Sequence, residues 1–392
     1  MPKEITHCIL AERAVHSMAA SSSPRKQATG AEIYFLYEKH PELLYFGSVA
    51  PDIFFYDIKL PWEIGVKHRG LAWGELIHGT HGEDSLAHIF EIFKILKDPE
   101  AQAIVRGRSF SDGEKQGILL FALGYLTHVA LDTIMHPIVY YFAGDYYARD
   151  RSEKLRAEAR HRAIETILDL YNLESIGSDL GRYKAMRKMA LPREWRDLVL
   201  GVYTLSLLQA WPEKSRELFG DSGAKPGSIR LHPLFKAAAR GYKKQILFNK
   251  IFQNSGLARS GLWYNRRKKD KLHFNSSLLY PARSYREYER RHPESHFRIT
   301  DINTYSDPLD NRTRAVRPGA LRRRSLARSH AFLRTAWLFA HGSIDEKAAR
   351  RVLKGYSLNN GRVGVPTGDM KFFAPLAIDG NFRYLNLEGV IV

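Results

Sequence analysis

The stretch GYLTHVALDTIMHP, residues 124–137, places three side chains of metal-binding types in the most apolar part of the chain. His128, Asp132 and His136 follow one another at a spacing of four residues. On a helix a step of four residues rotates by about 40°, so the three lie within one stripe about 80° wide and point into the same interior space. Pro137 is expected to bend or end this helix. Three interpretations are open here: hydrogen-bonded core groups, a membrane proton relay, or one wall of a metal site.

The surrounding run, residues 117–142, is long enough to cross a bilayer. It holds two histidines, one aspartate and a proline in its middle, where ionisable groups are costly in lipid. No second run of comparable length and hydropathy accompanies it. We therefore interpret the run as a buried core helix and keep a transmembrane helix as the minor alternative.

The chain has 392 residues, of which 44% are hydrophobic and 12% aromatic, enough to build the core of one large domain or two ordinary ones. Its single cysteine, Cys8, excludes a disulfide within one chain and a zinc site with several thiolates. Any metal must therefore be held by His, Asp and Glu, and the 16 histidines permit this.

The net charge of +18 predicts attraction to polyanions: nucleic acid, an anionic membrane surface, or substrates that carry phosphate. A generally basic, soluble surface explains the same number. The amino-terminal residues 1–18 carry charges and no apolar signal-peptide segment. We expect a cytoplasmic protein. Peripheral contact with the inner membrane surface is a further possibility that the basic charge allows.

Helical periodicity dominates the chain, and strand signals are scarce, so the expected fold class is all-α. Thr6 is the expected N-cap of the first helix. In the segment 152–173 the expected apolar side is Leu155, Ile164, Ile167, Leu168 and Leu170. Arg322, Arg323 and Arg328 are expected on the exposed side of a later helix. Helices are expected within 6–18, 81–96, 117–142, 152–173, 193–212, 232–254 and 319–341, a turn around Pro51, and a short strand at 389–392.

Further metal-ligand side chains lie outside the opening stretch. His161 and Glu165 form an i, i+4 pair on one helix face, and His7, Asp52 and His78 lie beside apolar or turn residues. Each has a structural explanation, because a lone histidine is often a hydrogen-bonded core residue and Asp52 can cap a helix. Taken together, imidazole and carboxylate without thiolate are typical of hydrolytic zinc sites.

At these residues the sequence resembles the zinc-dependent phospholipase C family, whose all-α fold is shared more distantly with S1/P1 nucleases. The resemblance implies a helical bundle over residues 1–175 that carries the catalytic site. Residues 176–392 are then a basic extension of helices and loops that packs on this core. The blocks that carry the resemblance are ITH with AERA (residues 5–14), GSVAPDIFFYD (47–57), HGTHGED (78–84), GYLTHVALDTIMHP (124–137) and RHRAIETILD (160–169).

The resemblance also implies roles for individual residues. His7 would bind one zinc ion, which secreted members also bind through the mature amino terminus. A second ion would be surrounded by Asp52, His78, His128 and Asp132, with Asp132 bridging the two. A third would be held by His136, His161 and Glu165, which gives two or three Zn²⁺ ions in all. His81 is the alternative to His78, and His68 is a remoter one.

The implied activity is hydrolysis of a phospholipid, in which a metal-bound hydroxide attacks the phosphodiester phosphorus and Asp52 acts as general base. One alternative is a single-strand nuclease of the same fold, with an aromatic and basic run at 263–269 as its binding platform. Another is a non-catalytic protein whose metal is structural. The sequence assigns no substrate-binding residues and no oligomeric state.

Overall fold

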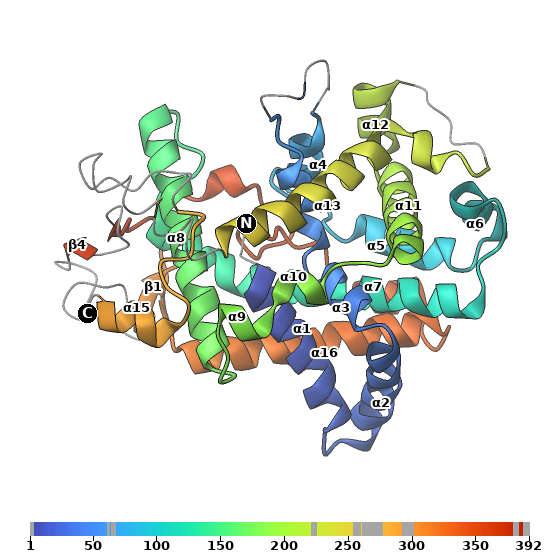
Figure 1. Cartoon of the computed structure of the whole chain (residues 1–392), viewed down its shortest axis with the longest axis horizontal. Helices are drawn as coiled ribbons and strands as arrows, with labels where there is room; N and C mark the ends of the chain where they lie inside the picture. The colour runs from blue at the N-terminus through green and yellow to red at the C-terminus, as the bar shows by residue number, and fades with distance from the viewer. Residues whose placement is uncertain are drawn as a thin grey trace.

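The computed structural model describes residues 4–60, 63, 68–220, 226–253, 260, 277–291, 302–378 and 384–386, and these are overwhelmingly helical (Figure 1). The all-α prediction is confirmed. The predicted strand at 389–392 and the aromatic and basic run at 263–269 lie outside the described residues.

The amino-terminal half supplies the helices that carry the candidate site. Their bounds are α1 (Glu4–Ala19), α2 (Pro24–Lys39), α3 (Pro41–Gly47), the 3-10 helix η1 (Ala50–Tyr56), α4 (Gly70–Ile77), α5 (Ala87–Ile95), α6 (Pro99–Arg106), α7 (Asp112–Ala143) and α8 (Arg151–Glu174).

The remaining helices follow α8 in the chain, together with two small antiparallel sheets. They are α9 (Leu180–Tyr183), α10 (Ala185–Lys188), α11 (Arg193–Ala210), α12 (Pro212–Phe219), η2 (Ile229–Leu231), α13 (Pro233–Phe252), α15 (Tyr285–Arg291), α16 (Pro318–Ala340), α17 (Glu346–Arg350) and η4 (Thr367–Asp369), with β1 (Thr304–Ser306) paired to β2 (Thr313–Ala315) and β3 (Ala377–Ile378) paired to β4 (Tyr384–Asn386).

Helix α7 is the central element of the fold. It begins at a capping box, in which the Ser111 hydroxyl accepts from the Glu114 amide and the Glu114 carboxylate accepts from the Ser111 amide. The helix is long and apolar enough to cross a membrane, but 94% of its most apolar stretch of 18 residues is buried inside the protein. This burial supports the core-helix interpretation. Pro137 lies inside α7, which continues to Ala143, so of the two predicted outcomes, a bend or an end, the helix does not end there.

Other helices pack around α7 and build a single hydrophobic core. Helix α3 crosses it on one side, and α16 runs along it on another (Figure 1). Residues from both the amino-terminal and the carboxyl-terminal regions belong to this core, Leu333 and Leu358 among them. The division of the chain at residue 175 stays a prediction.

Three local expectations need correction. Helix α1 includes Glu4 and Ile5, so Thr6 is not its N-cap; the Thr6 amide and hydroxyl both donate to Asp169 Oδ1 of α8. Leu155 is 44% exposed, because it lies in the first turns of α8 before that helix enters the core. Of the three arginines expected on the exposed side of α16, only Arg323 is exposed, whereas Arg322 and Arg328 are partly buried. Arg328 Nη1 donates to Thr133 Oγ1 at 2.6 Å, and its guanidinium lies over the ring of Tyr356.

Candidate metal centre

The eight predicted ligand side chains are all buried and lie in three adjoining groups. Within each group, one candidate ligand atom from every residue lies within 4.8 Å of the others. The groups are His7 with His128 and Asp132, Asp52 with His78 and His128, and His136 with His161 and Glu165.

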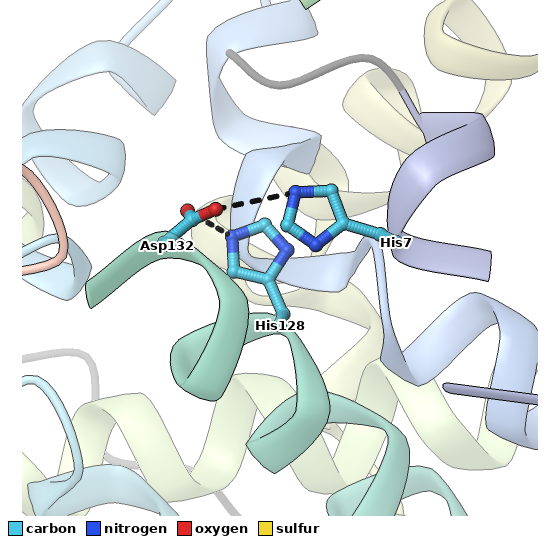
Figure 2. Close-up of side chains that lie close together, drawn as sticks. All are labelled: His7, His128 and Asp132. Atoms are coloured by element: carbon cyan, nitrogen blue, oxygen red, sulfur yellow. Dashed lines mark ion pairs between the residues drawn. The ribbon is translucent and has the colours of Figure 1, made fainter. Parts of the chain in front are cut away.

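The first group joins α1 to α7. Figure 2 shows His7 extending from α1 toward Asp132, with His128 beside it on α7. Asp132 Oδ1 lies 3.3 Å from His7 Nε2, and Asp132 Oδ2 lies 2.8 Å from His128 Nε2. The two imidazole rings stack with centroids 3.9 Å apart and planes 11° apart. Each carboxylate oxygen therefore faces a different imidazole.

The second group joins η1 and the end of α4 to the same helix α7. Asp52 lies in η1, and Asp52 Oδ1 is 3.3 Å from Nε2 of His78, the residue that follows α4. His128 belongs to this group as well as to the first, so a single imidazole adjoins both.

The third group joins α7 to α8. Glu165 Oε1 lies 2.7 Å from His161 Nε2 and 3.5 Å from His136 Nε2. His136 Nδ1 is 3.7 Å from Asp132 Oδ2, so this group adjoins the first. The i, i+4 spacing of His161 and Glu165 on α8 turns both side chains toward α7.

Backbone carbonyls fix the orientation of three histidines. Nδ1 of His78 donates to Gly74 O at 2.8 Å, Nδ1 of His128 to Ser48 O at 2.9 Å, and Nδ1 of His136 to Leu358 O at 3.0 Å. Each bond leaves Nε2 facing the carboxylates. Metal-binding histidines in proteins are usually held in this way through their second ring nitrogen.

The two alternative histidines are placed differently. His81 is exposed, and its backbone amide donates to the Glu83 carboxylate. His68 lies 3.0 Å from Asp57 Oδ1, in an ionic cluster where Arg240 also donates to Asp57. Neither histidine belongs to the three groups, whereas His78 does.

Burial and mutual charge set the protonation of the groups. Burial lowers the pKa of His161 to about 4, so this imidazole is neutral near pH 7. Burial also lowers the pKa of His128, but the charges of Asp132 and Asp52 outweigh it and raise that pKa to about 9. Burial raises the pKa of Asp132, whereas the imidazoles of His128, His136 and His7 bring it well below its usual range.

The hydrogen bonding of the polar atoms in these groups shows whether a metal ion would suit them. Within the described part of the chain, several make no hydrogen bond although they are fully buried: both nitrogens of His7 and of His161, both oxygens of Asp52 and of Asp132, and Nε2 of His128 and of His136. Buried polar atoms without partners cost about 1–3 kcal/mol each. A cation coordinated by these lone pairs would remove that cost, and the donors are those preferred by zinc.

The comparisons with known proteins agree with this donor set. A profile of the family described as zinc dependent phospholipase C matches residues 6–246. The chain belongs to the zinc-dependent phospholipase C family. The match covers more than half of the 392 residues and contains all eight predicted ligands. No curated protein and no solved structure gives a match to the chain.

A cleft beside the third group gives the candidate metal centre of this phospholipase C family member an opening. Its cavity volume is about 220 Å³, and His78, His136 and His161 lie in its wall. The sequence analysis missed the rest of the wall, although the aromatic run at 140–147 next to the ligand helix was a usable signal. The added lining is Phe55, Ile58, Leu71, Glu75, Thr80, Tyr140, Tyr146, Tyr147, Lys154, Glu158, Arg162 and Asn359.

No sequence pattern indicated that Asn359 belongs to the site, and this residue lies outside the family match. Its side-chain amide donates to Thr80 Oγ1 and Thr367 Oγ1, and its Oδ1 accepts from the Tyr140 hydroxyl. The neighbouring Leu358 amide donates to His78 O, and the Leu358 carbonyl accepts from His136. The segment 357–367 thus contributes Asn359 to the wall of the cleft, and its Leu358 holds two of the candidate ligands in place.

Proposed function

We propose that this chain is a zinc-dependent phosphodiesterase of the phospholipase C type, which hydrolyses phospholipids with two or three Zn²⁺ ions held by His7, Asp52, His78, His128, Asp132, His136, His161 and Glu165. The observation that carries the proposal is the set of three adjoining buried groups, composed of His, Asp and Glu, two of which contribute histidines to the wall of a cleft. Zinc bound here lowers the pKa of a water molecule toward neutrality and offsets the negative charge of a phosphodiester.

The general base of the proposed reaction is a carboxylate of the chain itself. Asp52 is the proposed general base: its Oδ1 faces His78, and its Oδ2 is the oxygen available to accept a proton from the attacking water. Burial raises the pKa of Asp52, but the charges of the nearby His128 and His78 imidazoles bring it below its usual value, so the carboxylate is ionised near pH 7. An ionised carboxylate is the form that a general base requires.

The cleft wall supports a phosphodiester with an apolar portion. Lys154 and Arg162 are cationic side chains of α8 in that wall, suited to phosphate oxygens. Ile58 and Leu71, which also line the cleft, are 49% and 59% exposed. An apolar rim beside the opening suits the glycerol and acyl part of a phospholipid better than a nucleotide, and this favours lipid over the nuclease alternative.

The test is hydrolysis by the purified, zinc-replete full-length protein. Vesicles of phosphatidylcholine, phosphatidylethanolamine and phosphatidylserine and a single-stranded oligonucleotide are offered in parallel, and diacylglycerol, phosphorylated headgroup and nucleotides are quantified. We expect diacylglycerol release that falls at least about 1,000-fold in His128→Ala and is unchanged in His81→Ala. Nucleotide release without diacylglycerol would select the nuclease, and no hydrolysis of any substrate would reject the enzyme.

A further inference from the structure

The opening of the cleft is bordered by exposed aliphatic side chains from three segments of the chain. Ile58, which follows η1, and Leu71 of α4 line the cleft and are 49% and 59% exposed. Leu155 of α8 is 44% exposed and lies seven residues before the cleft-lining Arg162. Seven residues make almost two full helical turns, so the two side chains lie on nearly the same face of α8. Leu155 therefore extends the cleft-facing side of that helix into its exposed first turns.

These aliphatic side chains form a group. Eight large hydrophobic side chains are exposed in the described part of the chain, and three of the eight are Ile58, Leu71 and Leu155. Exposed hydrophobic residues that occur singly are ordinary on a protein surface, whereas a group of them beside a site indicates an interaction surface. The opening of the cleft thus suits contact with an apolar layer as well as entry of a substrate.

Cationic side chains adjoin the aliphatic ones. Lys59 follows Ile58, and Lys154, which lines the cleft, precedes Leu155. Both lysines are exposed, and neither forms an ion pair with any residue that the structure describes. The segment 149–156 has four cationic and two acidic residues, which gives it a net positive charge. We call the following five residues the cleft edge: Ile58, Lys59, Leu71, Lys154 and Leu155.

We propose that the cleft edge docks on an anionic phospholipid bilayer. Ile58, Leu71 and Leu155 enter the interfacial layer, and the two lysines stay at the level of the lipid phosphates. Lysine suits that position because its hydrocarbon stem packs on apolar surface while its ammonium group remains in a polar environment. Aliphatic side chains together with cations are typical of protein surfaces that bind at a membrane interface.

The choice of a bilayer as the partner rests on the proposed phospholipase function. A phospholipid substrate lies in a membrane, and its phosphodiester is at headgroup level. Docking by the cleft edge places the opening of the cleft at that level, so the headgroup enters while the acyl chains remain among lipid. A second copy of this chain fits the cleft edge less well, because two basic surfaces repel each other.

The first experiment is sedimentation of the zinc-replete, full-length protein with sucrose-loaded vesicles. One set is phosphatidylcholine alone, and the other is an equal mixture of phosphatidylcholine and phosphatidylglycerol. We expect the anionic vesicles to bind at least about tenfold more tightly, and high salt to remove most of this difference by screening the exposed lysines. Absence of binding to anionic vesicles, or equal binding to both sets, would overturn the proposal.

Variants of the cleft edge outside the cleft wall locate the contact. Leu155→Asp and Lys59→Glu are compared with Leu231→Asp and Lys236→Glu, which alter exposed residues of η2 and α13. Neither η2 nor α13 supplies a residue to the cleft wall. We expect the first two variants to weaken binding to anionic vesicles about tenfold each and the controls to change it less than twofold. Equal effects of the two pairs would show that binding does not use the cleft edge.

A soluble, short-chain phospholipid below its micelle-forming concentration separates docking from the proposed activity, because its hydrolysis requires the metal centre and no membrane contact. We expect Leu155→Asp and Lys59→Glu to keep the wild-type rate on this substrate and to lose most of the rate on anionic vesicles. Hydrolysis of the soluble substrate without any vesicle binding would overturn the docking alone. Vesicle binding that depends on the cleft edge, without hydrolysis of either substrate, would overturn the activity and support the docking.

Discussion

Gly124 of α7 lies against Gly47 of α3 so closely that a methyl group at either position would overlap the backbone of the other helix. At Gly124 it would meet Leu44 O, and at Gly47 it would meet Phe121 O. The next residue after Gly47 is Ser48, whose carbonyl accepts from His128 Nδ1. This close helix crossing therefore sets the position of the imidazole that adjoins two of the three metal groups.

Gly124→Ala is expected to force α3 away from α7, because overpacking of a tight contact costs about 3 kcal/mol. Zinc content should fall as well, since Ser48 O would no longer orient His128. The measurements are denaturant unfolding and metal analysis after dialysis. Gly113→Ala, in the first turn of the same helix with open space around it, is the control and should change stability by less than about 1 kcal/mol. Equal effects of the two would show that the crossing is not tight.

His78→Ala should lower the bound zinc by about one equivalent, because it removes a donor from the Asp52 group. His81→Ala, which alters an exposed histidine three residues later, should retain the wild-type content. Elemental analysis of both proteins, prepared side by side, gives the answer. If His81→Ala loses zinc and His78→Ala retains it, then His81 and not His78 is the ligand.

Asn359→Ala should weaken the carboxyl-terminal wall of the cleft. It removes the bonds to Thr80, Thr367 and the Tyr140 hydroxyl, and buried groups left unpaired cost about 1–3 kcal/mol. Because Leu358 O orients His136, zinc affinity should fall about tenfold. Competition with a chromogenic chelator measures that affinity, and Asn303→Ala, at an exposed position, is the control. An unchanged affinity would mean that the wall does not support the third group.

We expect the titration of His88 to cause part of the loss of folding stability at acid pH. Burial lowers its pKa to about 3, and among the described residues neither ring nitrogen has a hydrogen-bond partner. Its pKa in the unfolded chain is about 6.5. The unfolded state thus binds the extra proton between these values, and this contribution to stability is present above pH 6.5 and is lost as the pH falls toward 3. The loss at pH 5 relative to pH 7 is about 2 kcal/mol.

His88→Phe tests this linkage, because it keeps a ring among Tyr125, Tyr203 and Trp211 and removes the titrating group. Urea unfolding at pH 7 and pH 5, both with chelator present so that metal loss does not contribute, should show a smaller difference for the variant. The same pH dependence in both proteins would assign the acid sensitivity to other groups.

Chelation itself should destabilise the protein. Removing zinc would leave Asp52 and Asp132 in the core without a cation, whereas free zinc at about 1,000 times its Kd would stabilise the fold by about 4 kcal/mol. The midpoint of thermal unfolding should therefore drop with EDTA and recover with added Zn²⁺ but not with Mg²⁺, which prefers oxygen ligands. An unfolding midpoint indifferent to EDTA would contradict a metal in these groups.

The sequence by itself determined the all-α class, the core position of α7 and the residues that can bind a metal. Periodicity is a local property, so His128, Asp132 and His136 could be placed on one stripe, and His161 and Glu165 on one face, without any tertiary contact. His7, Asp52 and His78 were candidates because of their apolar or turn neighbours, the family resemblance assigned them to particular ions, and the structure brings all eight residues into three groups.

Only the tertiary structure decided which histidines face the carboxylates and what surrounds them. His78 and His81 have similar local sequence, and their difference arises because the Gly74 carbonyl and Asp52 hold one of them inside the protein. Leu358 and Asn359 reach the site from more than 200 residues away in the chain, through backbone and amide contacts that leave no periodic pattern. Such contacts depend on how helices cross, and a spacing along one helix carries no information about the approach of another.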